Sequence, residues 1–526
     1  MSQSEMSSTG AVPASERGRR NRRQGSIKQR NRALQNNGPK KARAIEREVP
    51  IYNLLDDAAL DALEAQADWI LETIGIVFKD DAEALALFAA AGAVVDGERV
   101  KFPQGLAREL CKTAPQQFQM YGREPGYEIS IGGNSVVLTP AYGSPFVTDL
   151  DNGRRYATLH DFENFIKLSH VSPWMHHSGG TVCEPVNIPV NKRHLDMVYA
   201  HLRYSSKPFM GSVTNAERAE DSIAMARLVY GHEYMENHCV IQGNINVNSP
   251  LVFDDVMTGA LKAYARANQG IVLSPFILGG AMGPVTQPAL IAQAHAEAMV
   301  GIALGQLVRP GSPVVYGNFL TTMNLKTGAP TFGTPEANLS AMAIGQLCRR
   351  LGLPLRCGGH LTASKVADGQ AMQESSDSMN AGLLAGGNYI LHAAGWLEGG
   401  LTIGYEKFVM DLDRCGMIHT QLAGLTIDAN SLGTQAYLQA GPGENFLATD
   451  HTMANFRDAN YLSDLADTNS FEQWTEDGSL TIEQRANARW KAMLAEYRLP
   501  EFDPAIDREL KAFIEERKAS MPDMWY

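Results

Sequence analysis

The sequence predicts an α/β protein whose parallel sheet closes as a (β/α)8, or TIM, barrel, with an N-terminal helical extension and a C-terminal helical segment. From about residue 174, short apolar runs alternate with stretches of helical periodicity, which is the pattern of parallel strands joined by helices. Helix-to-strand connections are short, whereas several strand-to-helix connections are long and rich in Gly, Asn and Thr, as expected at the face where barrels carry active sites. Seven strands are predicted at residues 175–181, 207–213, 239–246, 270–278, 313–319, 354–359 and 388–394.

An eighth strand is needed to close such a barrel, and it comes either from residues 136–141 or from the region after Trp396. The alternative fold is a doubly wound open sheet, but no Gly-x-Gly-x-x-Gly turn supports it. We therefore divide the chain into a basic, disordered arm at 1–48, a mainly helical region at 49–134, the barrel at 135–430 and a C-terminal helical region at 431–526.

Local signals place several turns and helix ends. Asn152-Gly153 lies between two extended segments, and this dipeptide is typical of a hairpin turn. A capping side chain before an early proline indicates a helix start, because the proline lacks only an N–H that would be unpaired anyway. Such starts are predicted at Ser249-Pro250, at Thr286 before Pro288, and at Thr334-Pro335.

The formal net charge of the 526 residues is -12, but the first 48 residues carry twelve basic and four acidic side chains, a charge of +8. With few large apolar residues, this arm is expected to be poorly ordered alone. It binds either nucleic acid or, as the absence of any nucleic-acid motif favours, the acidic body or a partner subunit. We therefore expect no nucleic-acid partner, and a homo-oligomer.

The six cysteines are scattered and form no Cys-x-x-Cys pair. This is typical of reduced thiols in the cytoplasm rather than of disulfides or a zinc site. The chain has no apolar run of membrane-spanning length, and its N-terminus lacks the apolar core of a signal peptide. A cytoplasmic protein with no membrane partner is expected.

Three segments resemble the trimethylamine methyltransferase family: residues 139–149 (TPAYGSPFVTD), 359–370 (GHLTASKVADGQ) and 387–395 (GNYILHAAG). The resemblance implies a TIM barrel that moves a methyl group from a methylated amine to the cobalt of a separate corrinoid protein. Founding members carry pyrrolysine near the end of the sixth strand. This sequence has none, and His360 stands at or near that place. Members without pyrrolysine are similar to betaine demethylases that act on glycine betaine and related quaternary amines.

The chemistry of the leaving group also favours a quaternary amine as the substrate. A quaternary ammonium releases a neutral amine, whereas trimethylamine must first be protonated or otherwise activated. The protein then has to hold the cation, exclude water and align the methyl group with a cobalt nucleophile that the partner supplies. Three hypotheses remain open: demethylation of a quaternary amine, the same reaction on trimethylamine or another methylamine with His360 in the place of pyrrolysine, and a non-catalytic subunit that binds quaternary ammonium or regulates the corrinoid protein.

A quaternary ammonium has no N–H to donate, so aromatic faces bind it. The chain offers aromatic candidates near strand ends: Tyr142, Phe146, Phe276, Tyr316, Phe319 and Trp396. An aromatic residue in a barrel strand is more often part of the core, but Tyr316 and Phe319 flank the end of a strand. A betaine carboxylate would need donors, for which the candidates are Asn244, Asn246, Asn318, His360 and Thr362.

Gln242, Asn244 and Asn246 alternate at period two, which places their side chains on one face of a strand, expected to be the barrel lumen. Adjacent residues point to opposite faces, so His176-His177 is not expected to bind a metal. No metal and no tightly bound cofactor are predicted. The predicted site consists of His360 as the catalytic residue and Tyr142, Phe146, Gln242, Asn244, Tyr316, Asn318, Phe319 and Trp396 as substrate-binding residues.

Overall fold

The computed structural model describes residues 41–525. Of the arm predicted at 1–48, residues 1–40 lie outside the described residues. In the remainder, β1 (Ile45–Glu46) pairs antiparallel with β7 (Ser135–Leu138). The buried Arg47 side chain donates a hydrogen bond to the Gly387 carbonyl. The last residues of the predicted arm are therefore held on the sheet, where Ile45 is buried.

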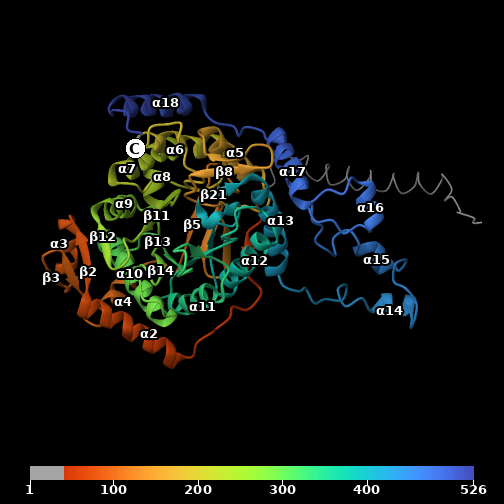
Figure 1. Cartoon of the computed structure of the whole chain (residues 1–526), viewed down its shortest axis with the longest axis horizontal. Coiled ribbons are helices and arrows are strands. Elements are labelled where there is room, and N and C mark those ends of the chain that lie inside the picture. The colour runs from red at the N-terminus through yellow and green to blue at the C-terminus, as the bar shows by residue number, and fades with distance from the viewer. Residues whose placement is uncertain (1–40, 526) are drawn as a thin grey trace, which may run out of the picture. The chain divides into compact units, whose positions relative to one another are not determined.

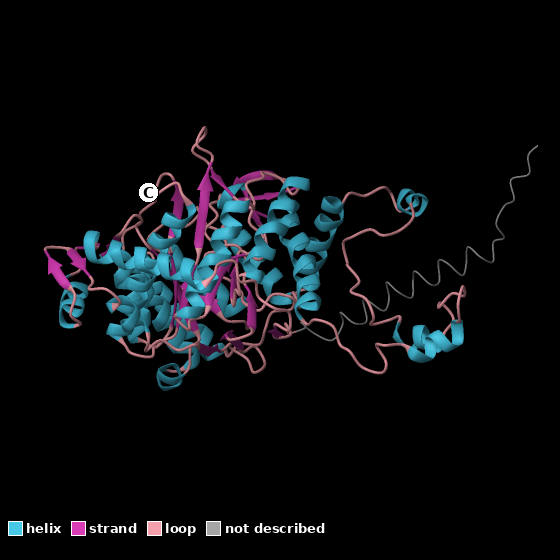
Figure 2. Cartoon of the chain, turned by 90° about the horizontal axis from the view of Figure 1, so that it is seen from below, coloured by secondary structure: helices cyan, strands magenta, loops and turns pink. Residues whose placement is uncertain are grey.

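A ten-stranded sheet forms the centre of the protein, with helices along it (Figure 2). Seven of its strands are mutually parallel, which confirms the predicted α/β class. In order across the sheet these are β10 (Phe209–Met210), β11 (Ile241–Asn246), β13 (Gly270–Ser274), β15 (Val314–Gly317), β18 (Leu355–Gly358), β19 (Tyr389–Leu391) and β7. Beyond β7 the sheet continues antiparallel through β6 (Ile129–Gly132) and β5 (Gln117–Met120).

Helices connect these strands and cover the outer side of the sheet. In chain order they are α5 (Leu159–Val171), α6 (Arg193–Tyr204), α7 (Ala216–Tyr230), α8 (His232–Asn237), α9 (Asp255–Arg266), α10 (Gln287–Val308), α11 (Pro335–Arg350), α12 (Gly369–Leu384) and α13 (Tyr405–Leu422). Helix α10 is apolar on all sides and buried over most of its length, because other helices pack around it. Three of these, α2 (Asp57–Trp69), α3 (Ala82–Ala90) and α4 (Leu106–Cys111), come from the N-terminal region (Figure 1).

Residues 49–134 are less uniformly helical than expected. Besides α2, α4 and α3 (Ala82–Ala90), this region contains a π-helical turn at Ile70–Ile74 and the strands β2 (Ile76–Lys79), β3 (Val94–Asp96) and β4 (Arg99–Lys101). These strands form a small sheet with β12 (Val252–Asp254), which pairs parallel with β2. Short β-branched and aromatic runs such as Ile-Val-Phe favour strands even next to helices.

Two predicted strands are divided in the structure. The strand expected at 270–278 breaks at Pro275 into β13 and β14 (Phe276–Gly279), because proline has no N–H for the ladder. The strand expected at 313–319 breaks at Asn318 into β15 and β16 (Phe319–Met323). The second halves leave the central sheet and form a three-stranded sheet with β17 (Pro330–Thr331).

The pairing register shows which of the two candidate segments extends the parallel sheet. Strand β7 pairs parallel with β19, so the candidate at 136–141 is the one that extends the sheet. The region after Trp396 lies elsewhere, in a four-stranded sheet of β20 (Trp396–Leu397), β21 (Thr402–Gly404), β8 (Phe146–Asp149) and β9 (Gly153–Tyr156). Strands β8 and β9 form the hairpin predicted at Asn152-Gly153.

Residues 175–181, predicted as a strand, contain no regular strand but bridge the two ends of the parallel series. The His176 N–H donates to the carbonyl of Leu138, the last residue of β7, at 3.1 Å. On the β10 side, the Ser178 N–H donates to the Pro208 carbonyl and the Met210 N–H to the Gly179 carbonyl, at 2.9 and 2.8 Å. The segment thus lies between β7 and β10.

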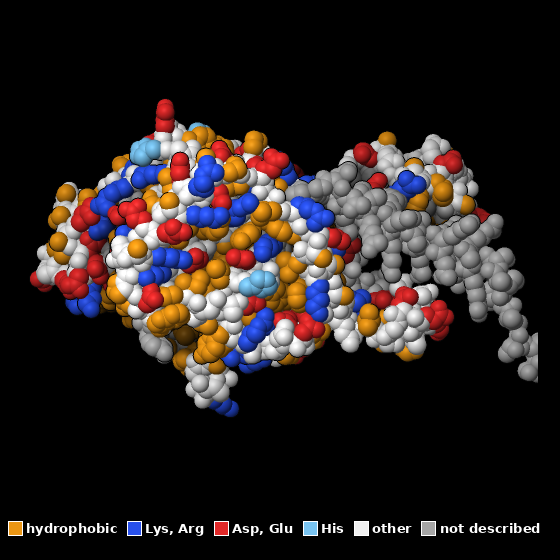
Figure 3. Space-filling model, turned by 90° about the horizontal axis from the view of Figure 1, so that it is seen from above, with side chains coloured by type: hydrophobic (Ala, Val, Ile, Leu, Met, Phe, Trp, Pro, Cys, Tyr) orange, Lys and Arg blue, Asp and Glu red, His pale blue; other side chains and the backbone are white. Residues whose placement is uncertain are grey.

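The C-terminal region contains α14 (Thr434–Ala440), α15 (Asp450–Asn455), α16 (Phe471–Glu476), α17 (Ile482–Glu496) and α18 (Pro504–Ala519). Helix α17 packs on α13, and α18 packs on α6 and α7 (Figure 1). The face seen from the α18 side carries acidic and basic side chains intermixed (Figure 3). Helix α18 forms ion pairs with the two helices under it, Arg517 with Asp221 of α7 and Lys518 with Asp196 of α6.

Predicted helix starts are confirmed at two of three positions. Thr286 and Thr334 are the N-cap residues of α10 and α11, although neither side chain makes a capping hydrogen bond. Ser249 instead donates to the buried Glu297 carboxylate, and α9 begins later, capped by Asp254. No helix within residues 41–525 has the length and apolar character needed to cross a bilayer. All six cysteines are free and buried.

Candidate functional site

One face of the central sheet, here called the inner face, carries side chains that pack into a core cluster of their own. Val137, Val272, Val315 and Tyr389 belong to a core cluster separate from the main one, which lies between the sheet and the helices. Parallel neighbours in register share a face. Arg356 is in register with Tyr389, and Tyr389 with Val137, so Arg356 also lies on the inner face.

Buried polar atoms without partners gather on this face. Asn244 is in register with Val272, as the predicted period-two pattern requires, and its Oδ1 has no hydrogen-bond partner. Gln242 donates from Nε2 to the Tyr389 hydroxyl, but its Oε1 is unpaired. His177 lies beside Tyr389 with an unpaired Nε2. Buried polar groups in proteins normally have partners, so these atoms mark a place for water or a ligand.

Five rings form what we call the aromatic cluster: Phe276, Phe319, Phe332, His392 and Trp396. Phe319 is at its centre, with ring centroids 5.0 Å from Phe276, 5.4 Å from His392 and 6.0 Å from Trp396. Trp396 lies 4.2 Å from His392 and 5.6 Å from Phe332. Four of these residues come just after the carboxyl ends of β13, β15 and β19, where α/β sheets place ligands.

Two polar atoms of the aromatic cluster are buried and unpaired: Trp396 Nε1 and His392 Nδ1. His392 has a positive φ of 66°, a backbone conformation that costs energy in a residue with a side chain. Burial, and then the charge of Arg356, hold the pKa of His392 well below its usual range. The His392 ring is therefore neutral near pH 7 and acts as an aromatic surface.

Arg356 lies directly against the aromatic cluster. Its guanidinium carbon is 4.7 Å from the Phe319 centroid, and its Nη1 donates to the Asn318 carbonyl at 2.6 Å. The side chain is 1% exposed and its Nε has no partner. Burial lowers the pKa of Arg356 to about 10, so the guanidinium remains charged near pH 7.

His360 occupies a different buried position, beside an ion pair. Its Nδ1 donates to the Ala393 carbonyl at 2.7 Å and lies 3.7 Å from Asp411 Oδ1, while its Nε2 is unpaired. Burial lowers the pKa of His360 to about 4, so the ring is neutral. Asp411 binds Lys407 at 2.6 Å and accepts the Gly395 N–H at 2.8 Å. Together these groups hold residues 393–395, which connect His392 to Trp396.

The structure corrects the expected directions of two aromatic side chains. Tyr316 belongs to the main core on the outer side of β15, where its hydroxyl is 3.1 Å from Nδ1 of His295 in α10. Because side chains alternate along a strand, Val315 and not Tyr316 lies on the inner face. Phe146 lies on the β8–β9 hairpin, where the Arg154 guanidinium covers its ring at 3.6 Å. Neither residue is part of the aromatic cluster.

The other candidate residues lie at different places in the structure. Tyr142 packs against the inner-face cluster, and Phe276 joins the aromatic cluster. Asn318 lies beside Arg356 through its carbonyl, while its side chain accepts the Leu320 N–H. Asn246 is exposed, and the Thr362 hydroxyl donates to Glu374.

The two adjacent histidines point apart, as predicted. His176 is bonded through Nδ1 to the Leu138 N–H and stacks on His419, whereas His177 is next to Tyr389. Within residues 41–525, no three His, Cys, Asp or Glu side chains are grouped so that they would hold a metal ion.

Arg356 and Phe332 are the main residues that the sequence analysis missed. Arg356 stands in the apolar run Leu-Arg-Cys-Gly, which was interpreted only as a strand. A charged residue inside a buried strand is itself a signal, because such residues are almost never fully buried without a partner. Phe332 carries no such signal, since it lies in a loop that reaches the aromatic cluster only through the fold.

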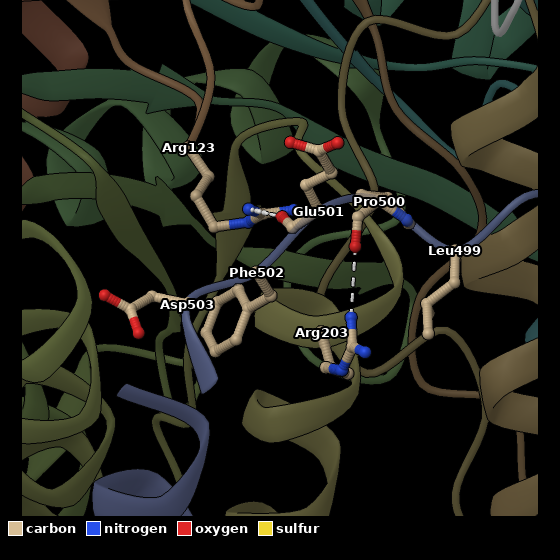
Figure 4. A pocket seen from close by; sticks show the side chains of 7 residues that line it. All are labelled: Arg123, Arg203, Leu499, Pro500, Glu501, Phe502 and Asp503. Atoms are coloured by element: carbon tan, nitrogen blue, oxygen red, sulfur yellow. Dashed lines mark hydrogen bonds between the residues drawn. The ribbon is translucent and has the colours of Figure 1, made fainter. Parts of the chain in front are cut away.

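A surface depression of about 540 Å³ lies apart from these residues, where the segment before α18 crosses the body (Figure 4). Arg123 donates to the Glu501 carbonyl and Arg203 to the Pro500 carbonyl. Phe502 lies against both guanidinium groups. These contacts attach the C-terminal segment to the body, so both arginines already have protein partners.

Comparison with known proteins adds independent information. The trimethylamine methyltransferase (MTTB) family model matches residues 16–522. The chain is 38% identical over 470 residues to a glycine betaine methyltransferase of Desulfitobacterium hafniense, covering 89% of this chain and 98% of that protein. It is 26% identical over 469 residues to a trimethylamine methyltransferase MttB from another strain of that species, covering 88% and 93%.

Among solved structures, the Methanosarcina barkeri monomethylamine methyltransferase (MtmB) matches with a TM-score of 0.45 and 11% identity, covering 89% of this chain and 97% of that one.

Proposed function

Because this chain belongs to the trimethylamine methyltransferase (MTTB) family, it is a methyltransferase, and we propose that it moves a methyl group from a quaternary amine, glycine betaine or a similar compound, to the Co(I) of a separate corrinoid protein. The observation that carries this proposal is the aromatic cluster. Its five rings, of which Phe332, His392 and Trp396 are buried and Phe276 and Phe319 partly buried, pack together at the carboxyl ends of the parallel strands, and two of them carry unpaired buried nitrogen atoms.

The aromatic cluster fits a quaternary ammonium better than a protonatable amine. A ring face attracts such a cation by about 0.5–2 kcal/mol without needing a hydrogen bond. His392 is neutral and adds a ring rather than a charge. A second titratable group near the cluster, His360, is also neutral, so neither histidine offers a proton that an uncharged amine would need.

The reaction balances without acid or base. The corrinoid supplies the nucleophile, whose electron pair forms the new bond to the methyl carbon. The carbon–nitrogen bond breaks, its electron pair stays on nitrogen, and the amine leaves uncharged. The side chains of this protein hold the cation in one orientation and exclude water, which are the contributions that orientation and burial make to such a transfer.

His360 fits the role of a positioning residue. It holds the Ala393 carbonyl, and its neighbour Asp411 holds the Gly395 N–H. These bonds fix the backbone between His392 and Trp396, two rings of the aromatic cluster. In this proposal His360 acts on the substrate through Trp396, while Tyr142, Gln242 and Asn244 line the inner face near the bound amine.

We also propose that the parallel sheet closes as a (β/α)8 barrel, in which residues 175–181 take the irregular strand position between β7 and β10. Support comes from the hydrogen bonds of His176 to Leu138 and of Ser178 to Pro208, which link this segment to β7 and β10. Cysteines that form no disulfide are typical of a reducing compartment, so we place the reaction in the cytoplasm. The partner is the corrinoid protein, which docks where the strands end.

A direct assay tests this function. Purified protein is mixed with a Co(I) corrinoid protein and with glycine betaine, proline betaine, carnitine, choline or trimethylamine, and corrinoid absorbance is followed. Methyl transfer from a betaine and not from trimethylamine is expected. Transfer from trimethylamine alone would support the methylamine alternative. Binding of a quaternary amine with no transfer from any compound would indicate a non-catalytic subunit.

A further inference from the structure

Arg356 is a buried charge with no protein counter-charge. Its side chain is 1% exposed, and within residues 41–525 no carboxylate lies within ion-pair distance of it. Its hydrogen bond to the Asn318 carbonyl satisfies one N–H of Nη1, and Nε is unpaired. Two other buried cations have more partners, since Lys207 donates to three carbonyls and Lys407 pairs with Asp411. Arg47, which is 6% exposed, also donates to one carbonyl and has an unpaired Nε, but its partner is Gly387 and not the aromatic cluster.

Such an arrangement is costly without a ligand. Moving an ion out of water costs several kcal/mol even after the protein relaxes, and a buried N–H without an acceptor adds to that cost. The guanidinium keeps its proton near pH 7. An anion that arrives with the substrate explains a residue with these properties better than a purely structural role does.

The position of Arg356 relative to the aromatic cluster defines the shape of that ligand. The guanidinium lies over Phe319, and the same ring contacts His392 and Trp396. A cation held by these rings would share the Phe319 ring with the guanidinium, and two like charges at a separation of roughly 7 Å repel by about 2 kcal/mol at an effective dielectric constant near 20. A ligand with its own negative charge between the two cations converts that repulsion into attraction.

We propose that Arg356 binds the carboxylate of the substrate through its unpaired Nε–H, so that the site selects quaternary amines that carry a carboxylate close to the nitrogen over cations that lack one. This inference rests on the proposed function and adds its specificity-determining residue. Glycine betaine and proline betaine have the required short separation between charges. Choline, in which a hydroxymethyl group replaces the carboxylate, does not.

The test compares the affinities of glycine betaine and choline by isothermal titration calorimetry. In the wild-type protein, glycine betaine is expected to bind at least 30-fold more tightly than choline. Arg356→Met, which keeps an unbranched side chain up to the position of Nε but removes the charge, should weaken glycine betaine at least 100-fold. Choline should bind as well as before or more tightly, because the repulsion between its cation and the guanidinium is gone. Arg356→Lys, which keeps the charge, should retain part of the preference.

Arg47→Met is the matched control. Arg47 is also a buried arginine that donates to a carbonyl, that of Gly387, but Gly387 precedes β19 and lies at the opposite end of that strand from His392. This variant should keep the wild-type preference. Equal weakening of both ligands in Arg356→Met, or a preference that persists in it, would overturn the inference.

The role of Arg356 and the methyl transfer itself are tested by different outcomes. If the wild-type protein transfers methyl from glycine betaine but Arg356→Met keeps the preference for the carboxylate, only the role of Arg356 is wrong. If the wild-type protein transfers methyl from no quaternary amine, the proposed function is wrong and this inference falls with it.

Discussion

The guanidinium carbon of Arg356 lies 4.7 Å from the centroid of the Phe319 ring, and Nη1 of the same arginine donates to the carbonyl of Asn318. One side chain of β18 thus holds both the backbone and the ring at the break between β15 and β16. Because one face of Phe319 is occupied by a cation, the proposed site leaves the substrate ammonium only the remaining surface of the aromatic cluster, in which Trp396 and His392 are the closest pair of rings.

Replacing Trp396 is therefore expected to weaken binding of the cation. Trp396→Leu removes the largest ring face while keeping an apolar side chain, and should raise KM for glycine betaine by about 10-fold to 30-fold, in line with ~1.4–2 kcal/mol for a buried cation–π contact. Phe471→Leu, at a ring that is 73% exposed on α16, is the control and should leave KM unchanged. Equal KM values for the two variants would show that Trp396 does not contact the cation.

The backbone at Gly400 gives a second way to displace Trp396. Gly400 has a φ of 98°, and a Cβ added there would lie 2.5 Å from Cη2 of the Trp396 ring. Gly400→Ala should lower kcat/KM at least 10-fold because the ring must shift. Gly441→Ala has similar backbone strain at a φ of 68°, but open space around the new Cβ. It should lose some stability and little kcat/KM. Steady-state kinetics with glycine betaine separates strain from displacement of the ring.

Period-two alternation was the most successful part of the sequence analysis. It placed Gln242 and Asn244 on one face and separated His176 from His177, because side-chain direction along a strand follows from the backbone alone. The binding role predicted for Tyr316 rested instead on its place at a strand end, without regard to register. Counting from Val315 or Gly317 would have assigned Tyr316 to the helix side of the sheet.

Other features of the site depend on distant parts of the chain. Phe332 meets Trp396 only because β16 and β17 leave the central sheet after Asn318. The contact between His360 and Asp411 joins the end of β18 to α13, about fifty residues later. No local pattern encodes such contacts. The α/β class and the parallel strands were predictable, since they follow from alternating periodicity.

The buried Lys407–Asp411 pair should be sensitive to removal of one partner. Asp411→Asn leaves Lys407 charged and unpaired at 0% side-chain exposure, so the free energy of unfolding should fall by about 3–5 kcal/mol. The double variant Lys407→Met/Asp411→Leu removes both charges and should recover more than half of that loss. Urea denaturation measures both. A double variant less stable than Asp411→Asn would contradict the view that the uncompensated charge causes the loss.

Acid should destabilise the protein through histidines that are buried in the neutral form. In the unfolded chain His360 takes up a proton near pH 6.5, but in the folded protein its pKa is about 4. Between these values the unfolded state binds more protons. The free energy of unfolding therefore falls by ~1.4 kcal/mol per pH unit for each such histidine as the pH drops below about 6.5, and this loss ends below the folded pKa.

His176 and His295, with pKa values lowered to about 3, add to the same trend. Urea denaturation at pH 7 and pH 5 should show a smaller loss of stability for His360→Gln than for the wild-type protein, by about 2 kcal/mol, because one proton-binding site of the unfolded chain is gone. His232→Gln, at an exposed histidine in α8, should behave as wild type. If His360→Gln lost as much stability between the two pH values as the wild-type protein, His360 would have to be protonated in the folded state, and its role as a neutral anchor for Ala393 would have to be abandoned.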